Sequence, residues 1–136
     1  MTPSEYQNPI LCADYSDPDI VRVGDDFFMV SSSFNHVPAL PILHSTDLVN
    51  WTIINHVMDE LPLPGYDRYQ PGKGVWAPSI RWHDGKLWVC FSTPDEGIFI
   101  CHTEDPWGEW SAPHCLREAR GWIDPCPFWD DNGQAW

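Results

Sequence analysis

The feature that most constrains the fold of this chain is an internal repeat. A residue followed by Pro, then a short apolar strand and a polar turn with Gly, occurs three times, beginning at Asp17-Pro18, Ala77-Pro78 and Asp124-Pro125. Strongly apolar runs at 27–30 and 87–91 follow the first two copies. This order of strand, turn and strand is typical of a β-hairpin.

A second element repeats behind the first. The segments 42–47 and 98–105 each predict a strand and a turn, and each leads to a Trp, Trp51 or Trp110, that is expected to open the next strand. One unit therefore predicts about four strands, with blade 1 at about 17–54, blade 2 at about 77–116 and the start of blade 3 from 124. Units of this size are typical of β-propeller blades. Their second strands are apolar on both faces, whereas a two-layer sandwich alternates more cleanly.

Propellers close with about four to eight blades, so these units do not complete one. We therefore expect an all-β protein in which 1–136 form the N-terminal part of one propeller domain. The alternative, a complete small β-domain, is weaker because the third hairpin has only begun at Trp136. The isolated chain is expected to be marginally stable or prone to aggregation, since one apolar blade face lacks its cover.

Composition narrows the partners. Twenty Asp and Glu against seven Lys and Arg give a net charge of −13, which argues against nucleic acid or an anionic membrane and suits a neutral ligand. No signal peptide or membrane-length apolar run is visible. The five Cys include no Cys-x-x-Cys pair, which favours buried free thiols over a disulfide or zinc site and predicts a reducing, cytoplasmic location.

The residues before the three Pro are the first candidates for chemistry. The first strand of a propeller blade lines the central channel, so Asp17, Ala77 and Asp124 are expected at one mouth, in extended geometry before Pro. Asp-Pro alone is usually a turn, but its recurrence in two units favours a functional site. Two carboxylates at one pocket are typical of glycosidic bond cleavage. Phe34 and Trp76 suit the walls of a sugar pocket, and each also suits a core position.

At these residues the chain resembles glycoside hydrolase family 43, the β-xylosidase and α-L-arabinofuranosidase group. The stretches that carry the resemblance are 8–11, 14–19, 22–34, 40–51, 74–80 and 121–125. The resemblance implies a five-bladed propeller that hydrolyses its substrate with inversion. It departs from the family pattern at Ser16 and Asp19, where Pro and Ser are commoner.

The resemblance also implies roles. Asp17 is the expected general base, and Asp124 the third carboxylate, which tunes the pKa of the acid and orients the sugar. Substrate contacts are expected from Phe34, Asn35, His36, Trp76, Ala77 and Ile123, although His36 equally suits a structural role.

The general acid of the family is a Glu on a later blade. No Glu of this chain has its context, and Glu60, Glu96, Glu104, Glu109 and Glu118 all lie in loops or at strand ends of early blades. A central ion or histidine would also come from later blades, so no cofactor or metal is expected here.

Three functions compete. The first is an exo-acting glycosidase for terminal xylosyl or arabinofuranosyl residues of plant hemicellulose oligosaccharides, foremost a β-1,4-xylosidase. The second is a non-catalytic sugar-binding propeller or an inactive fragment, and a full-length form of either could be a homo-oligomer. The third, a protein-interaction propeller, predicts a Trp-Asp pair in every blade, but Trp129-Asp130 has no counterpart in the other two units.

Overall fold

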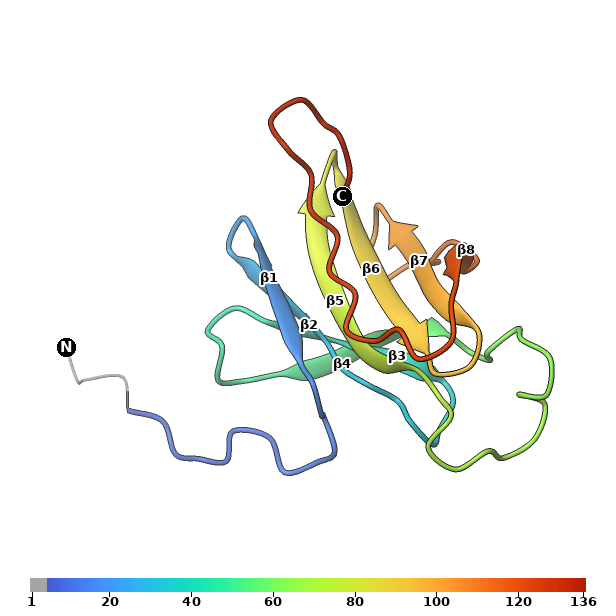
Figure 1. Ribbon diagram of the computed structural model, residues 1–136. Helices are drawn as coiled ribbons and strands as arrows, with labels where there is room; N and C mark the ends of the chain where they lie inside the picture. The colour runs from blue at the N-terminus through green and yellow to red at the C-terminus, as the bar shows by residue number, and fades with distance from the viewer. Residues whose placement is uncertain (1–4) are drawn as a thin grey trace.

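The computed structural model describes residues 5–136, and within them the regular structure is two four-stranded antiparallel sheets without a helix (Figure 1). The first sheet contains, in order, β1 (Asp19–Val23), β2 (Asp26–Val30), β3 (Ala39–Ser45) and β4 (Thr52–Met58). The second contains β5 (Trp76–His83), β6 (Lys86–Thr93), β7 (Gly97–Thr103) and β8 (His114–Glu118). The all-β class and the two four-stranded units are confirmed. Residues 1–4, which belong to the N-terminal stretch where the sequence shows no signal peptide, lie outside the described residues.

Two-residue turns set the register of the repeated hairpins. Val23 pairs with Asp26 and His83 pairs with Lys86, so each turn consists of two residues. In the second turn Asp84 and Gly85 both have positive φ, 49° and 74°, which matches the twist that joins antiparallel strands. A third hairpin begins with a bridge between Trp129 and Ala135.

The fourth strands differ from the sequence expectation. Trp51 directly precedes β4, but Trp110 lies well before β8, which begins at His114. The chain first pairs irregularly at Ser111, whose N–H donates to the carbonyl of His102 at 2.9 Å and whose hydroxyl accepts from the His102 N–H at 3.0 Å. Pro113 then interrupts regular pairing because it has no N–H to donate.

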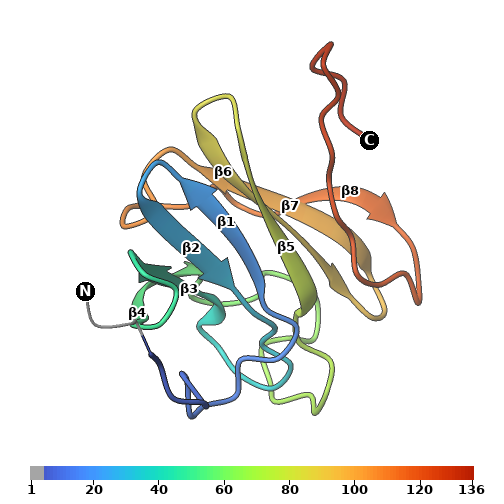
Figure 2. The same cartoon turned by 90° about the vertical axis from the view of Figure 1, so that its left-hand side faces the viewer.

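The core lies between the two sheets. One cluster of buried apolar side chains includes Phe28, Val30, Leu40 and Ile42 of the first sheet and Ile80, Leu87, Val89 and Phe91 of the second. Both views place β1 beside β5, so the first strands of the two units are neighbours (Figures 1 and 2). Burying one such side chain contributes about 1.5–3 kcal/mol, so this shared core is the main attraction between the blades.

The third unit covers the second sheet only in part. Its chain runs beside β5 (Figure 1), where the Ser79 hydroxyl donates to the carbonyl of Pro125 at 2.7 Å and the ring of Trp129 stacks on His83 with centroids 4.5 Å apart. Trp122, Phe128 and Trp136 are nevertheless 55%, 62% and 76% exposed. These side chains are apolar, like those at the interface between two blades, but they are not packed as such an interface is.

The five Cys are all free, but they divide by burial. Cys90 and Cys101 are buried, and burial raises the pKa of each thiol to about 12. Cys12, Cys115 and Cys126 are exposed, so the expectation of buried thiols is wrong for these three. They lie outside the apolar middle strands that bury the other two. No helix in the described part of the chain is long and apolar enough to cross a membrane.

Candidate active site

The three residues before Pro share an unusual backbone. Asp17, Ala77 and Asp124 have φ of 49°, 26° and 55°, so the expected extended geometry is wrong. In the second unit Trp76 pairs with Ser92 and Ser79 pairs with Cys90, which leaves a bulge around Ala77. Bulges commonly place a residue in left-handed geometry. Such a conformation is strained for a residue with a Cβ, and strain of this kind is typical of functional positions.

Ser32 joins the first two of these positions. Its hydroxyl donates to Oδ2 of Asp17 at 2.9 Å and accepts from the backbone N–H of Ala77 at 2.9 Å. Ser32 is buried, whereas Asp17 is exposed. The equivalent starts of blades 1 and 2 are therefore held together by one buried hydroxyl, with the carboxylate of Asp17 presented to solvent.

Phe34 and Trp76 form the expected aromatic wall. Their rings meet edge to face with centroids 5.9 Å apart. The backbone brings them together through a bridge between Ser33 and Val75 and a hydrogen bond from Gly74 N–H to the carbonyl of Phe34 at 2.8 Å. Gly is needed here, because a Cβ on Gly74 would lie 2.6 Å from the Phe34 oxygen and closer still to that of Ser33.

Asn35 helps to fix the same wall, whereas His36 does not. Oδ1 of Asn35 accepts from the N–H of Gly72 at 2.6 Å, and the carbonyl of Gly72 accepts from the Trp76 indole at 3.0 Å. The exposed His36 makes no such hydrogen bond among the described residues. Asn35 thus positions the Trp76 ring indirectly, through Gly72.

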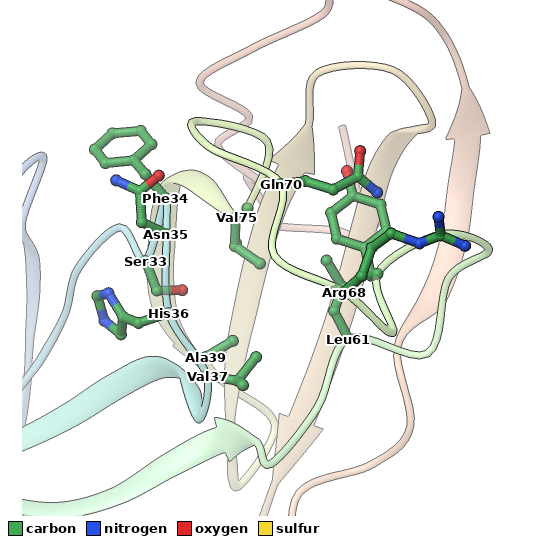
Figure 3. Close-up of a pocket in the computed structure, with 12 residues that line it drawn as sticks. Ser33, Phe34, Asn35, His36, Val37, Ala39, Leu61, Arg68, Gln70 and Val75 are labelled. Carbon is green, nitrogen blue, oxygen red and sulfur yellow. The ribbon is translucent and has the colours of Figure 1, made fainter.

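A small pocket lies beside this wall (Figure 3). Phe34, Asn35 and His36 line it together with Leu61, Arg68 and Gln70 from the segment between the sheets. It holds about 60 Å³, which is room for a few water molecules. Asp17, Trp76 and Asp124 do not line it, so the pocket brings together only part of the candidate residues.

Sequence reasoning missed the segment that forms the far side of this pocket. The Tyr66 hydroxyl donates to Glu96 at 3.0 Å, and Lys73 pairs with Asp95 at 2.5 Å. Burial and the neighbouring Glu96 raise the pKa of Tyr66, and Lys73 lowers the pKa of Asp95. Both contacts tie the segment to the turn between β6 and β7. The sequence offers no periodic signal for them, because each pairs a loop residue with a distant turn.

Asp124 and Ile123 stand apart from the other candidates. Both are exposed, and among residues 5–136 no hydrogen bond or ion pair joins Asp124 to Asp17. Ile123 lines an apolar hollow with Cys90, Ile98 and Leu116. Their substrate roles stay predictions. Within the same residues, no group of three or more His, Cys, Asp or Glu side chains is arranged to hold a metal ion.

Comparison with known proteins places this geometry in a family. The model described as "Glycosyl hydrolases family 43" matches residues 6–136. A xylosidase/arabinosidase of Butyrivibrio fibrisolvens is 42% identical over 95% of this chain and 25% of its own length. A non-reducing end alpha-L-arabinofuranosidase of Bacteroides ovatus is 38% identical over 88% of this chain and 23% of its own length.

Solved structures agree. The xylan beta-1,4-xylosidase from Bacillus halodurans C-125 superposes with a TM-score of 0.83 at 31% identity, over 97% of this chain and 26% of its own. The chain thus spans about a quarter of the length of the relatives it matches. The predicted β-propeller, of which these residues supply about two blades and the start of a third, is confirmed. Because the family model matches residues 6–136 and these relatives are similar along most of the chain, the chain belongs to glycosyl hydrolases family 43.

Proposed function

We propose that this chain is the N-terminal part of an inverting glycosidase that removes terminal xylosyl or arabinofuranosyl residues from hemicellulose oligosaccharides. The observation that carries the proposal is the setting of Asp17. One carboxylate oxygen accepts from Ser32 at 2.9 Å, and the other accepts no hydrogen bond from the described residues. The exposed side chain therefore keeps one oxygen available to take a proton from water.

In this proposal Asp17 acts as the general base. Water forms the new bond to the anomeric carbon and loses a proton to Asp17, while the glycosidic oxygen leaves with a proton from an acid supplied by residues beyond this chain. An inverting site leaves about 6.5–9.5 Å between acid and base so that the water fits. Asp124, at the equivalent position of the third unit, keeps that acid protonated through its negative charge.

We favour xylose over arabinose as the substrate sugar. Among the relatives compared above, the superposed structure is named a xylan beta-1,4-xylosidase, one relative is named for both activities and one for arabinofuranose alone. The wall formed by Phe34 and Trp76 suits either sugar, because an aromatic ring stacks on any apolar sugar face. The preference therefore rests on the relatives' names and not on a contact.

The test uses a full-length protein that carries this sequence. We expect it to hydrolyse 4-nitrophenyl β-D-xylopyranoside faster than 4-nitrophenyl α-L-arabinofuranoside, and NMR should show α-xylose as the first product. The 136-residue chain alone should give no turnover, because it lacks the acid. Sugar binding without hydrolysis by the full-length protein would favour a non-catalytic propeller. β-Xylose as the first product would contradict inversion.

A further inference from the structure

We propose that Ser32 is a positioning residue, which orients the carboxylate of Asp17 for water activation. This inference rests on the proposed function, because it assigns Ser32 a part in the same reaction. The Ser32 hydroxyl lies between blades 1 and 2 and contacts both.

The direction of the two hydrogen bonds follows from their chemistry. The backbone N–H of Ala77 can only donate, so the Ser32 oxygen accepts it at 2.9 Å. A Ser hydroxyl carries one hydrogen, and that hydrogen is therefore left for Oδ2 of Asp17 at 2.9 Å. A hydrogen bond to a carboxylate is among the stronger kinds. The free oxygen of Asp17 is consequently held at a fixed angle.

Ser32 itself has little freedom to move. It is 2% exposed, and its own N–H donates to the carbonyl of Ser16 at 3.0 Å. Asp17, which accepts the hydrogen bond from Ser32, directly follows Ser16 in the chain. Ala77, which donates to Ser32, directly follows Trp76. Ser32 therefore fixes the distance between the base and the aromatic wall, which sit on different blades.

The second blade provides an internal comparison. Ser92 pairs with Trp76 as Ser32 pairs with Ser16, so the two Ser occupy equivalent positions. Ser92 is 0% exposed and its hydroxyl has no partner among the described residues. Position 77 is Ala, which has no carboxylate to receive the bond. Of these two equivalent hydroxyls, only that of Ser32 forms a hydrogen bond within residues 5–136, and only its unit carries Asp before the Pro.

The experiment compares Ser32→Ala with Ser92→Ala in the full-length protein. Each variant removes one buried hydroxyl from the same position of a blade, so general effects on packing should match. Ser32→Ala should lower kcat by about 10- to 100-fold, the range expected for one hydrogen bond to a charged group. KM should stay near the wild-type value, because activation of water is needed only in the transition state. Ser92→Ala should leave both constants near wild type.

Crystal structures of both variants provide the second readout. Asp17 should change its side-chain orientation in Ser32→Ala and keep it in Ser92→Ala. If Ser32→Ala fails to fold, Ser32→Cys keeps a hydrogen-bond donor at this position, although a larger and weaker one, and should show an intermediate loss of kcat.

The outcomes separate this inference from the proposed function. An unchanged kcat in Ser32→Ala, or equal losses in both variants, would overturn the positioning role while leaving the glycosidase assignment intact. A wild type without turnover would instead overturn the proposed function. The orientation of Asp17 then decides: a change confined to Ser32→Ala supports the positioning role, and no change overturns it.

Discussion

The two junctions between successive units of this chain are built on the same positions but differ in completeness. At the first junction Asp19 accepts from the Ile80 N–H at 2.8 Å, and Asn55 donates to the carbonyls of Pro106 and Gly108 at 3.0 and 2.7 Å. At the second, Ser79, the equivalent of Asp19, donates to Pro125, while Trp122 and Trp136 stay exposed. The repeat thus specifies where blades meet, and individual side chains decide how tightly.

Comparing the units also separates features that serve the fold from residues that serve the chemistry. The strained residue before Pro recurs in all three units with positive φ, so it belongs to the repeat. The carboxylate at that position does not, because the second unit carries Ala77. Asp17 is the one that a buried hydroxyl holds, which is why the functional proposal centres on the first junction.

The largest effect is expected from a variant of Asp17, the proposed catalytic residue of the first junction. Asp17→Asn in the full-length protein removes the proposed base, and kcat should fall by about 10² to 10⁴-fold. The loss should persist for aryl glycosides with good leaving groups, since water must still be activated. Steady-state kinetics on a nitrophenyl xyloside measure it.

Asp124→Asn is the matched variant from the third unit. Its negative charge is proposed to keep the acid protonated, so its removal should move the alkaline limb of the pH–rate profile to lower pH. Near-normal kcat in Asp17→Asn, or the same pH profile in both variants, would contradict the division of roles.

The next effect concerns folding and compares equivalent Gly residues. Gly74 and Gly121 each stand three residues before the strained position. A Cβ on Gly74 would collide with the Ser33 and Phe34 carbonyl oxygens, whereas one on Gly121 meets nothing within 4 Å. Gly74→Ala should lower the free energy of unfolding by about 3 kcal/mol or more.

Gly121→Ala should cost about 1 kcal/mol, because only its φ of 74° is unfavourable for Ala. Urea unfolding followed by Trp fluorescence measures both. Equal losses in the two variants would mean that the first junction is no tighter than the second.

A smaller effect is expected at the polar contacts of the junctions. Asp19→Ala leaves the N–H of the fully buried Ile80 without an acceptor and removes the ion pair to Arg81. An unsatisfied buried group costs about 1–3 kcal/mol. Ser79→Ala removes one neutral hydrogen bond and should cost about 1 kcal/mol. A larger loss in Ser79→Ala, measured by the same urea unfolding, would reverse the order of the two junctions.

The sequence predicts the architecture well because the repeat is a property of residue type and spacing. The x-Pro steps, the turn at Asp84-Gly85 and the apolar second strands each follow from local chemistry. Asp17, Phe34 and Trp76 could be named because Asp17 and Trp76 lie at the Pro steps and Phe34 follows the end of an expected strand.

What the sequence could not predict depends on contacts between distant residues. Ser32 lies in a run of three Ser that carries no spacing signal, and its role is visible only once Asp17 and Ala77 approach from two blades. Asp19 was a departure from the family pattern, and its contact with Ile80 joins residues 61 positions apart. The left-handed backbone before Pro was missed because the local preference of X-Pro for extended geometry is overridden in the folded chain, at Ala77 by a bulge.

The smallest predicted effect is a pH dependence that the first sheet should show. Burial lowers the pKa of His56 on β4, and the nearby His36 lowers it further, while Asp59 opposes the shift. Because the folded pKa lies below the unfolded value of about 6.5, the unfolded state binds more protons between the two values. The free energy of unfolding should therefore fall as the pH drops from 7.5 to 5.5. His56→Gln should weaken that dependence, and His36→Gln should weaken it less, since burial is the larger cause. Urea midpoints at the two pH values test this, and an unchanged dependence in His56→Gln would show that other groups carry it.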